Sequence, residues 1–130
     1  ATLVCGRLSP MGDLELCNAG HCAPLLIHDG RPTPLKPTSV PVGLFCGSDY
    51  PTRQVRLVPG DARVLYTDGV TETFNLEEHE YGEERLSQVV LSHAAETPHR
   101  LVSACVRDLA SFRGPATRAD DVTLMAIRRV

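Results

Sequence analysis

Tryptophan is absent from this sequence and lysine is nearly so, because Lys36 is the only lysine among 13 basic residues. There are 16 acidic residues, which leaves a net charge of −3. Binding to nucleic acid or to anionic lipid through charge requires a basic surplus, so both functions are excluded. No apolar run approaches the roughly 20 residues that cross a bilayer, and no basic and apolar leader precedes a small-residue cleavage site. We therefore expect a cytoplasmic protein that binds no nucleic acid and no membrane.

The cysteine pattern lacks the pairs that a zinc site or a disulfide framework needs. The five cysteines are an odd number, and no two of them form a Cys-x-x-Cys pair. Cys5 and Cys17 could face each other across a hairpin, but we favour buried thiols in a reducing compartment. A metal cluster of Cys17, His21, Cys22 and His28 is the alternative.

A chain of 130 residues that is 42% hydrophobic can form one domain with its own core. Short patterns bounded by turn residues predict strands over 2–8, 14–17, 25–28, 53–58 and 62–67. The proline-rich stretch 31–42 fits only an edge strand or an irregular loop. Two helices follow, over 83–95 and from Pro98 to Gly114, with Thr97 as N-cap, and a strand over 122–127 closes the chain. Strands followed by helices favour an antiparallel α+β layer fold, in which the last strand returns to the sheet.

Acidic residues stand at the ends of two of these strands. Asp68 follows the strand 62–67 directly, Gly69 permits a sharp turn beside it, and Glu72 lies four residues on. Asp120 and Asp121 immediately precede the last strand. Carboxylate oxygens are the ligands that Mg²⁺ and Mn²⁺ prefer, although each motif alone also fits an ordinary turn or loop.

A third motif, Asn-Ala-Gly-His at 18–21, predicts a tight turn that presents an imidazole. By itself the motif is more typical of a turn with a surface histidine. The order of all the motifs is more specific. Asn-Ala-Gly-His is followed by Gly-Leu-Phe at 43–45, Val-Pro-Gly-Asp at 58–61, Leu-Tyr-Thr-Asp-Gly-Val-Thr-Glu at 65–72, Tyr-Gly-Glu-Glu-Arg-Leu at 81–86 and Ala-Asp-Asp-Val-Thr-Leu at 119–124. This series resembles the SpoIIE/RsbU branch of the PP2C (PPM) serine/threonine phosphatases over nearly the whole chain.

The resemblance implies an antiparallel β-sandwich with covering helices, in PP2C-like α-β-β-α layers. It also implies a metal-dependent phosphatase with two Mn²⁺ or Mg²⁺ ions bridged by a water. Asp68 and Asp120 match the family's direct metal ligands, and Gly69 would keep the backbone close to them. Glu72 matches an acidic residue near an auxiliary third metal. Three further candidates line the site: Asn18, His21 and Asp121.

One family motif is missing. The Gly-Asp-x-x-Gly-His-Gly-like segment, which supplies a bridging aspartate, has no counterpart in this sequence. We therefore expect residues 1–130 to be the C-terminal portion of a single PP2C-like phosphatase domain, incomplete at its N-terminus and with little or no activity alone. Unpaired strand edges would then favour a homodimer.

The resemblance further implies the substrate, a phosphoserine or phosphothreonine of a regulatory protein such as an anti-anti-sigma factor in partner-switching signalling. Two alternatives stay open. One is a non-catalytic binding module that keeps the fold, and the other is a small redox or zinc protein built on the cysteines.

Overall fold

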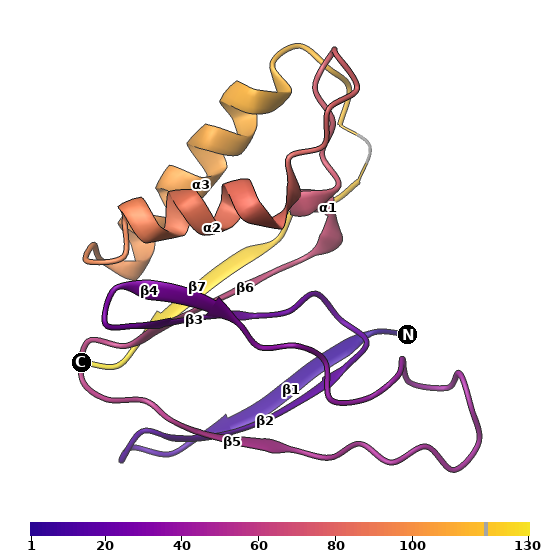
Figure 1. Cartoon of the computed structure of the whole chain (residues 1–130), viewed down its shortest axis with the longest axis vertical. Coiled ribbons are helices and arrows are strands. Elements are labelled where there is room, and N and C mark those ends of the chain that lie inside the picture. The colour runs from indigo at the N-terminus through magenta and orange to yellow at the C-terminus, as the bar shows by residue number, and fades with distance from the viewer. Residues whose placement is uncertain (119) are drawn as a thin grey trace.

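The computed structural model describes residues 1–118 and 120–130, so Ala119 of the motif at 119–124 lies outside the described residues. Figure 1 shows the chain order of strands, helices and a last strand. The strands are β1 (Leu3–Leu8), β2 (Asp13–Ala19), β3 (Leu25–His28), β4 (Arg31–Pro34), β5 (Arg53–Arg56), β6 (Ala62–Tyr66) and β7 (Leu124–Arg128). The helices are α1 (Asp68–Thr71), α2 (Gly82–Ser92) and α3 (Pro98–Arg113).

The strands form two antiparallel sheets. One has the order β1-β2-β5, and the other has the order β4-β3-β6-β7. The proline-rich β4 is an edge strand, as the sequence predicts, because proline cannot donate a ladder hydrogen bond. The last strand, β7, follows both long helices in sequence and pairs with β6, with Tyr66 opposite Leu124.

The two sheets and the helix pair stack as three layers (Figure 1). The larger core lies between the helices and the four-stranded sheet, and it includes Val64, Leu86 and Leu101. A smaller core joins the two sheets through Leu14 and Leu16 on one side and Leu26 and Leu35 on the other. The described residues thus form a β-sandwich with one helical layer, and the second helical layer of the expected α-β-β-α arrangement is not among them.

Local sequence signals set the ends of these elements. Asp29 and Gly30 both have positive φ and close the two-residue hairpin between β3 and β4. Gly60, with φ +96°, forms the third position of the turn that the Asp61 N–H closes onto the Val58 carbonyl. The Thr97 hydroxyl accepts from the Arg100 N–H at the start of α3. The predicted N-cap is thus confirmed, and both turns lie where turn residues bound the predicted strands.

Other details differ from the expectations. α2 ends at Ser92 and does not extend to 95 as expected, and the ring of His93 places Nδ1 2.9 Å from the Val89 carbonyl. The expectation of buried cysteines is wrong for Cys5 and Cys46, which are exposed. Cys5 does lie opposite Cys17 across the β1–β2 hairpin. Among the described residues, no helix is long and apolar enough to span a membrane.

Candidate metal site

Thr67 joins the ends of two neighbouring strands, β6 and β7. Its N–H donates to the Thr123 carbonyl at 3.1 Å, and the Thr123 N–H donates to Thr67 Oγ1 at 3.0 Å. The Thr67 hydroxyl donates in turn to the Asp121 carbonyl at 3.2 Å. The residue that precedes Asp68 therefore holds the segment that contains Asp120 and Asp121.

Gly69 packs against the same segment because it has no side chain. A Cβ at Gly69 would overlap the carbonyl oxygen of Asp121. Its φ is not positive, so the requirement for glycine comes from space and not from backbone conformation. The Gly69 carbonyl also accepts the Thr73 hydroxyl at 2.7 Å, which fixes the end of α1. The glycine and Thr67 together bring the two predicted ligand segments into contact.

The carboxylates of Asp68 and Asp120 are exposed, and each is oriented by the backbone of the following residue. The Gly69 N–H donates to Asp68 Oδ1 at 3.0 Å, and the Asp121 N–H donates to Asp120 Oδ1 at 2.6 Å. The Asp121 side chain forms an ion pair instead, with Oδ1 3.5 Å from Nη2 of Arg118. Of these three aspartates, Asp121 is thus the one that pairs with an arginine among the described residues.

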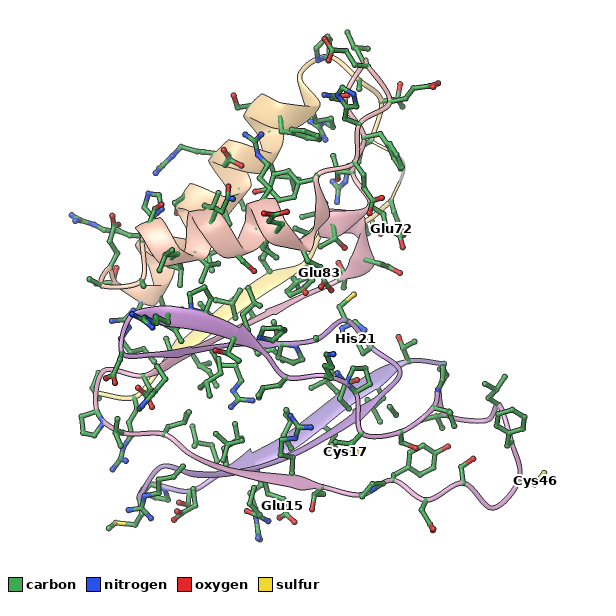
Figure 2. The ribbon with its side chains drawn as sticks, viewed as in Figure 1. Glu15, Cys17, His21, Cys46, Glu72 and Glu83 are labelled. Atoms are coloured by element: carbon green, nitrogen blue, oxygen red, sulfur yellow. The ribbon has the colours of Figure 1, made fainter. Side chains whose placement is uncertain are left out.

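Two glutamates extend the acidic group. Glu72 caps α1 through its N–H to the Asp68 carbonyl, and its side chain is exposed. Glu83, in the first turn of α2, accepts the Tyr66 hydroxyl at 3.2 Å. Burial, and then the Glu83 carboxylate, raise the pKa of Tyr66, so its phenol remains a hydrogen-bond donor. Figure 2 shows Glu72 and Glu83 near the junction of α1 and α2.

Cys22 lies beside these carboxylates, just before β3. Burial raises the pKa of its thiol most, and the negative charge of Asp68 raises it further, with smaller contributions from Glu83 and Glu72. The thiol is therefore protonated at neutral pH and lies within electrostatic range of three carboxylates. His28, by contrast, lies at the other end of β3 and contacts Asp61 Oδ1 at 3.0 Å. The alternative cluster of Cys17, His21, Cys22 and His28 thus has its members separated by the length of a strand.

Hydrogen bonds within the Asn18–His21 turn position Cys22. Asn18 is buried, and its Nδ2 donates to the carbonyls of His21 and Cys22 at 3.1 and 3.3 Å. Its Oδ1 accepts the His21 N–H at 2.8 Å. The His21 ring lies 3.3 Å from Thr2 Oγ1 and projects below Glu83 in Figure 2. Asn18 therefore shapes the turn, and His21 contacts the start of the chain.

The donor set agrees with a hard divalent cation in its chemistry. Exposed carboxylates on rigid backbone are suitable ligands for Mn²⁺ or Mg²⁺. The described residues nevertheless contain no group of three His, Cys, Asp or Glu side chains placed to hold one ion. Asp68 and Asp120 alone are thus fewer ligands than a divalent cation takes.

Comparison with known proteins assigns the chain to a family. The family model of stage II sporulation protein E (SpoIIE) matches residues 1–130. The chain belongs to the SpoIIE family. This agrees with the resemblance found in the motifs, and the antiparallel α+β fold of the SpoIIE-family chain is confirmed by its structural neighbours.

Three relatives illustrate the extent of the match. The RsbU and RsbW domains of Rv1364c from Mycobacterium tuberculosis give a TM-score of 0.81 at 34% identity, over 98% of this chain and 36% of theirs. The SiaA-PP2C domain of Pseudomonas aeruginosa gives a TM-score of 0.78 at 24% identity, over 92% of this chain and 47% of its own. Protein IcfG of Synechocystis is 27% identical over 120 residues, which is 91% of this chain and 19% of IcfG. The SpoIIE-family chain therefore spans less than half of each relative.

Sequence reasoning did not place Tyr66, Glu83 and Cys22 at this site. The segments that contain Tyr66 and Glu83 carry the family resemblance, but nothing in their spacing shows that a phenol from β6 reaches the first turn of α2. The only available signal for Cys22 was its place directly after the Asn-Ala-Gly-His turn.

Proposed function

We propose that this chain is the C-terminal portion of a protein serine/threonine phosphatase domain that hydrolyses phosphoserine or phosphothreonine on a regulatory protein. Membership of the SpoIIE family supports the reaction class. The observation that supports the proposal most is the close approach of Gly69 to the Asp121 carbonyl, because Asp68 and Asp120 each directly precede a residue of this contact. The partner-switching type of substrate, an anti-anti-sigma factor, follows from the resemblance to RsbU-type proteins.

Asp68 and Asp120 would hold Mn²⁺ or Mg²⁺, with Glu72 and the Gly69 backbone beside them. When bound, such ions lower the pKa of a coordinated water and stabilise negative charge on a phosphoryl group. This chain's own residues orient the two carboxylates through backbone N–H groups and connect their segments through Thr67. The remaining ligands would come from the rest of the domain, so the 130 residues alone should bind the ions weakly and hydrolyse little.

The experiment measures Mn²⁺ binding by calorimetry and the hydrolysis of p-nitrophenyl phosphate, both with the full-length protein in a reducing buffer. Asp68→Asn and Asp120→Asn should each lower kcat/KM by about 100-fold or more and weaken Mn²⁺ binding. Asp49→Asn, an exposed aspartate in the loop before β5, is the matched control and should change neither quantity. Unchanged metal binding in both ligand variants would refute the assignment of these ligands.

A second candidate is a non-catalytic module that keeps the fold. The observation in its favour is that the described residues hold no complete metal-ligand group. A full-length protein that binds no Mn²⁺ and hydrolyses no aryl phosphate, yet unfolds cooperatively, would establish this second function.

A further inference from the structure

A groove follows the C-terminal half of α3, next to the segment that precedes β7. It has a volume of about 270 Å³ and is lined by Val106, Leu109, Ala110, Arg113, Arg118 and Val122. The helical members recur at spacings of three and four residues, so they form one stripe on the side of α3 toward this segment. The groove is apolar along its length and basic at its end.

The groove begins at the candidate metal site. Arg118 Nε donates to the Asp120 carbonyl at 2.9 Å, and Arg118 Nη2 lies 3.5 Å from Asp121 Oδ1. Arg118 therefore belongs both to the wall of the groove and to the segment that presents Asp120. A peptide whose phosphorylated residue reached Asp120 would have its neighbouring residues over this groove.

Arg113 lines the groove where it could contact an acidic side chain of such a peptide. Its Nε is buried and has no hydrogen-bond partner among the described residues. Arg113 also lines a second hollow of about 200 Å³, together with Leu76 and Phe112. The loop between α1 and α2 borders this hollow and exposes 46% of Phe74 and 68% of Leu76. The second hollow is also lined by Glu77 and is mixed in character, whereas the first is mainly apolar. An arginine beside apolar side chains is a combination that dominates many protein interfaces.

We propose that this groove binds the segment of the phosphoprotein substrate that adjoins its phosphorylated residue, with an apolar side chain between Val106 and Val122 and an acidic side chain at Arg113. The inference rests on the proposed phosphatase function and names a determinant of its substrate specificity. Charge complementarity selects the acidic side chain, because the guanidinium of Arg113 lines the groove and a carboxylate would pair with it.

The experiment measures kcat/KM of the full-length protein with Mn²⁺ on phosphoserine peptides and on p-nitrophenyl phosphate, which is too small to reach the groove. A leucine and a glutamate are moved through the positions that flank the phosphoserine, and each peptide is paired with versions that contain Ser for Leu or Gln for Glu. Arg113→Ala should abolish a preference for Glu over Gln of about tenfold at the best position. Val106→Glu should abolish the preference for Leu over Ser, and it provides an independent variant if Arg113→Ala fails to fold.

Arg107→Ala is the matched control, since this arginine is exposed on α3 and lines a different surface hollow. It should leave both preferences unchanged. The inference would be overturned if the Arg113→Ala protein still preferred Glu over Gln, or if the unchanged protein showed neither preference. Hydrolysis of p-nitrophenyl phosphate by the same proteins would in that case still support the phosphatase function. Absence of p-nitrophenyl phosphate hydrolysis would overturn the proposed function itself, and this inference with it.

Discussion

Gly69 lies so close to the carbonyl oxygen of Asp121 that a Cβ at position 69 would overlap this oxygen. The contact joins α1 to the segment before β7, and these are separated in sequence by both long helices. Since Asp68 precedes Gly69 and Asp120 precedes Asp121, the contact also sets the spacing of the two predicted ligands.

Gly69→Ala should therefore move the Asp120–Asp121 segment. Overpacking at such a contact costs about 1–3 kcal/mol of unfolding free energy, and Mn²⁺ binding should weaken as Asp120 moves away from Asp68. Thermal unfolding measures the loss of stability, and calorimetry of the full-length protein measures the loss of Mn²⁺ affinity. Gly47→Ala is the comparison, because a Cβ there meets no neighbour and only its positive φ is strained. It should lower stability without changing Mn²⁺ affinity, and equal loss of affinity in both variants would contradict the prediction.

Arg63→Leu should stabilise the chain. The Arg63 side chain is 1% exposed, and its three guanidinium nitrogens have no hydrogen-bond partner among the described residues. Burial lowers the pKa of Arg63 to about 10, which reflects the unfavourable removal of its charge from water. Replacing an unpaired buried charge by a hydrophobic side chain should raise the unfolding free energy by about 1–4 kcal/mol.

Chemical denaturation of the Arg63 variant and of Arg129→Leu tests this expectation. Arg129 makes a hydrogen bond to the Leu57 carbonyl, so its replacement should destabilise the chain. A loss of stability in Arg63→Leu as well would mean that Arg63 has a partner outside the described residues.

The pair of His28 and Asp61 should make stability depend on pH. The hydrogen bond to Asp61 raises the pKa of His28 above its usual value, and the charges of Asp61 and Asp29 add to this effect. A raised pKa in the folded state stabilises the fold below the unfolded pKa of about 6.5, and this stabilisation disappears as pH rises through the folded value. His28→Gln should therefore differ most from the unchanged chain in acid.

Thermal unfolding between pH 5.5 and pH 9 is the measurement. Asp61→Asn keeps the acceptor for the Val58 N–H and removes the charge, so it should abolish the same pH dependence. A stability difference in His28→Gln that is constant across this range would rule out the ion pair as its cause.

Asp108 should be the most important charged residue of the helix pair. It accepts Arg85 Nε and Nη2 at 2.8 and 2.9 Å, and the Tyr81 hydroxyl at 2.8 Å. Arg85 also stacks 4.9 Å from the centre of the Phe112 ring. Asp108→Ala leaves the arginine and the phenol without their acceptor, which should cost about 1–3 kcal/mol at neutral pH.

The same clamp should weaken in acid. Hydrogen bonds from Arg85 lower the pKa of Asp108, so the stabilisation is present above the usual carboxyl pKa and is lost as pH falls through the lowered value. Denaturant unfolding at pH 7 and below pH 3 checks both points. Arg107→Ala, on the neighbouring residue of α3, is the control, and a loss of stability equal to that of Asp108→Ala would contradict the role of the clamp.

The sequence was sufficient for most of the fold because its signals are local. Glycine with positive φ at Gly60, proline at Pro98 and the hydroxyl of Thr97 each act within one turn, so their effects can be predicted without tertiary structure. The edge position of β4 follows equally directly from its prolines.

Tertiary contacts decided what the sequence could not. Arg63 stands in a strand between apolar neighbours, and alternation alone does not reveal that its face is covered by a second sheet. Cys5 and Cys46 are exposed although cysteine is usually buried, because β1 is an edge strand and Cys46 lies in a projecting loop (Figure 2). Glu83 joins the candidate site only through the Tyr66 hydroxyl, which requires α2 to be packed on β6.

The hydrogen bond from Thr67 to the Asp121 carbonyl spans 54 positions of the chain. During synthesis β6 and both long helices emerge before β7, which pairs with β6. Until β7 is synthesised, the edge of β6 next to Asp68 therefore has no partner strand. Closure of this long loop is entropically costly and comes after the local turns have formed. The candidate site is therefore assembled in the last stage of folding, and metal affinity should report on complete folding more strictly than helix content does.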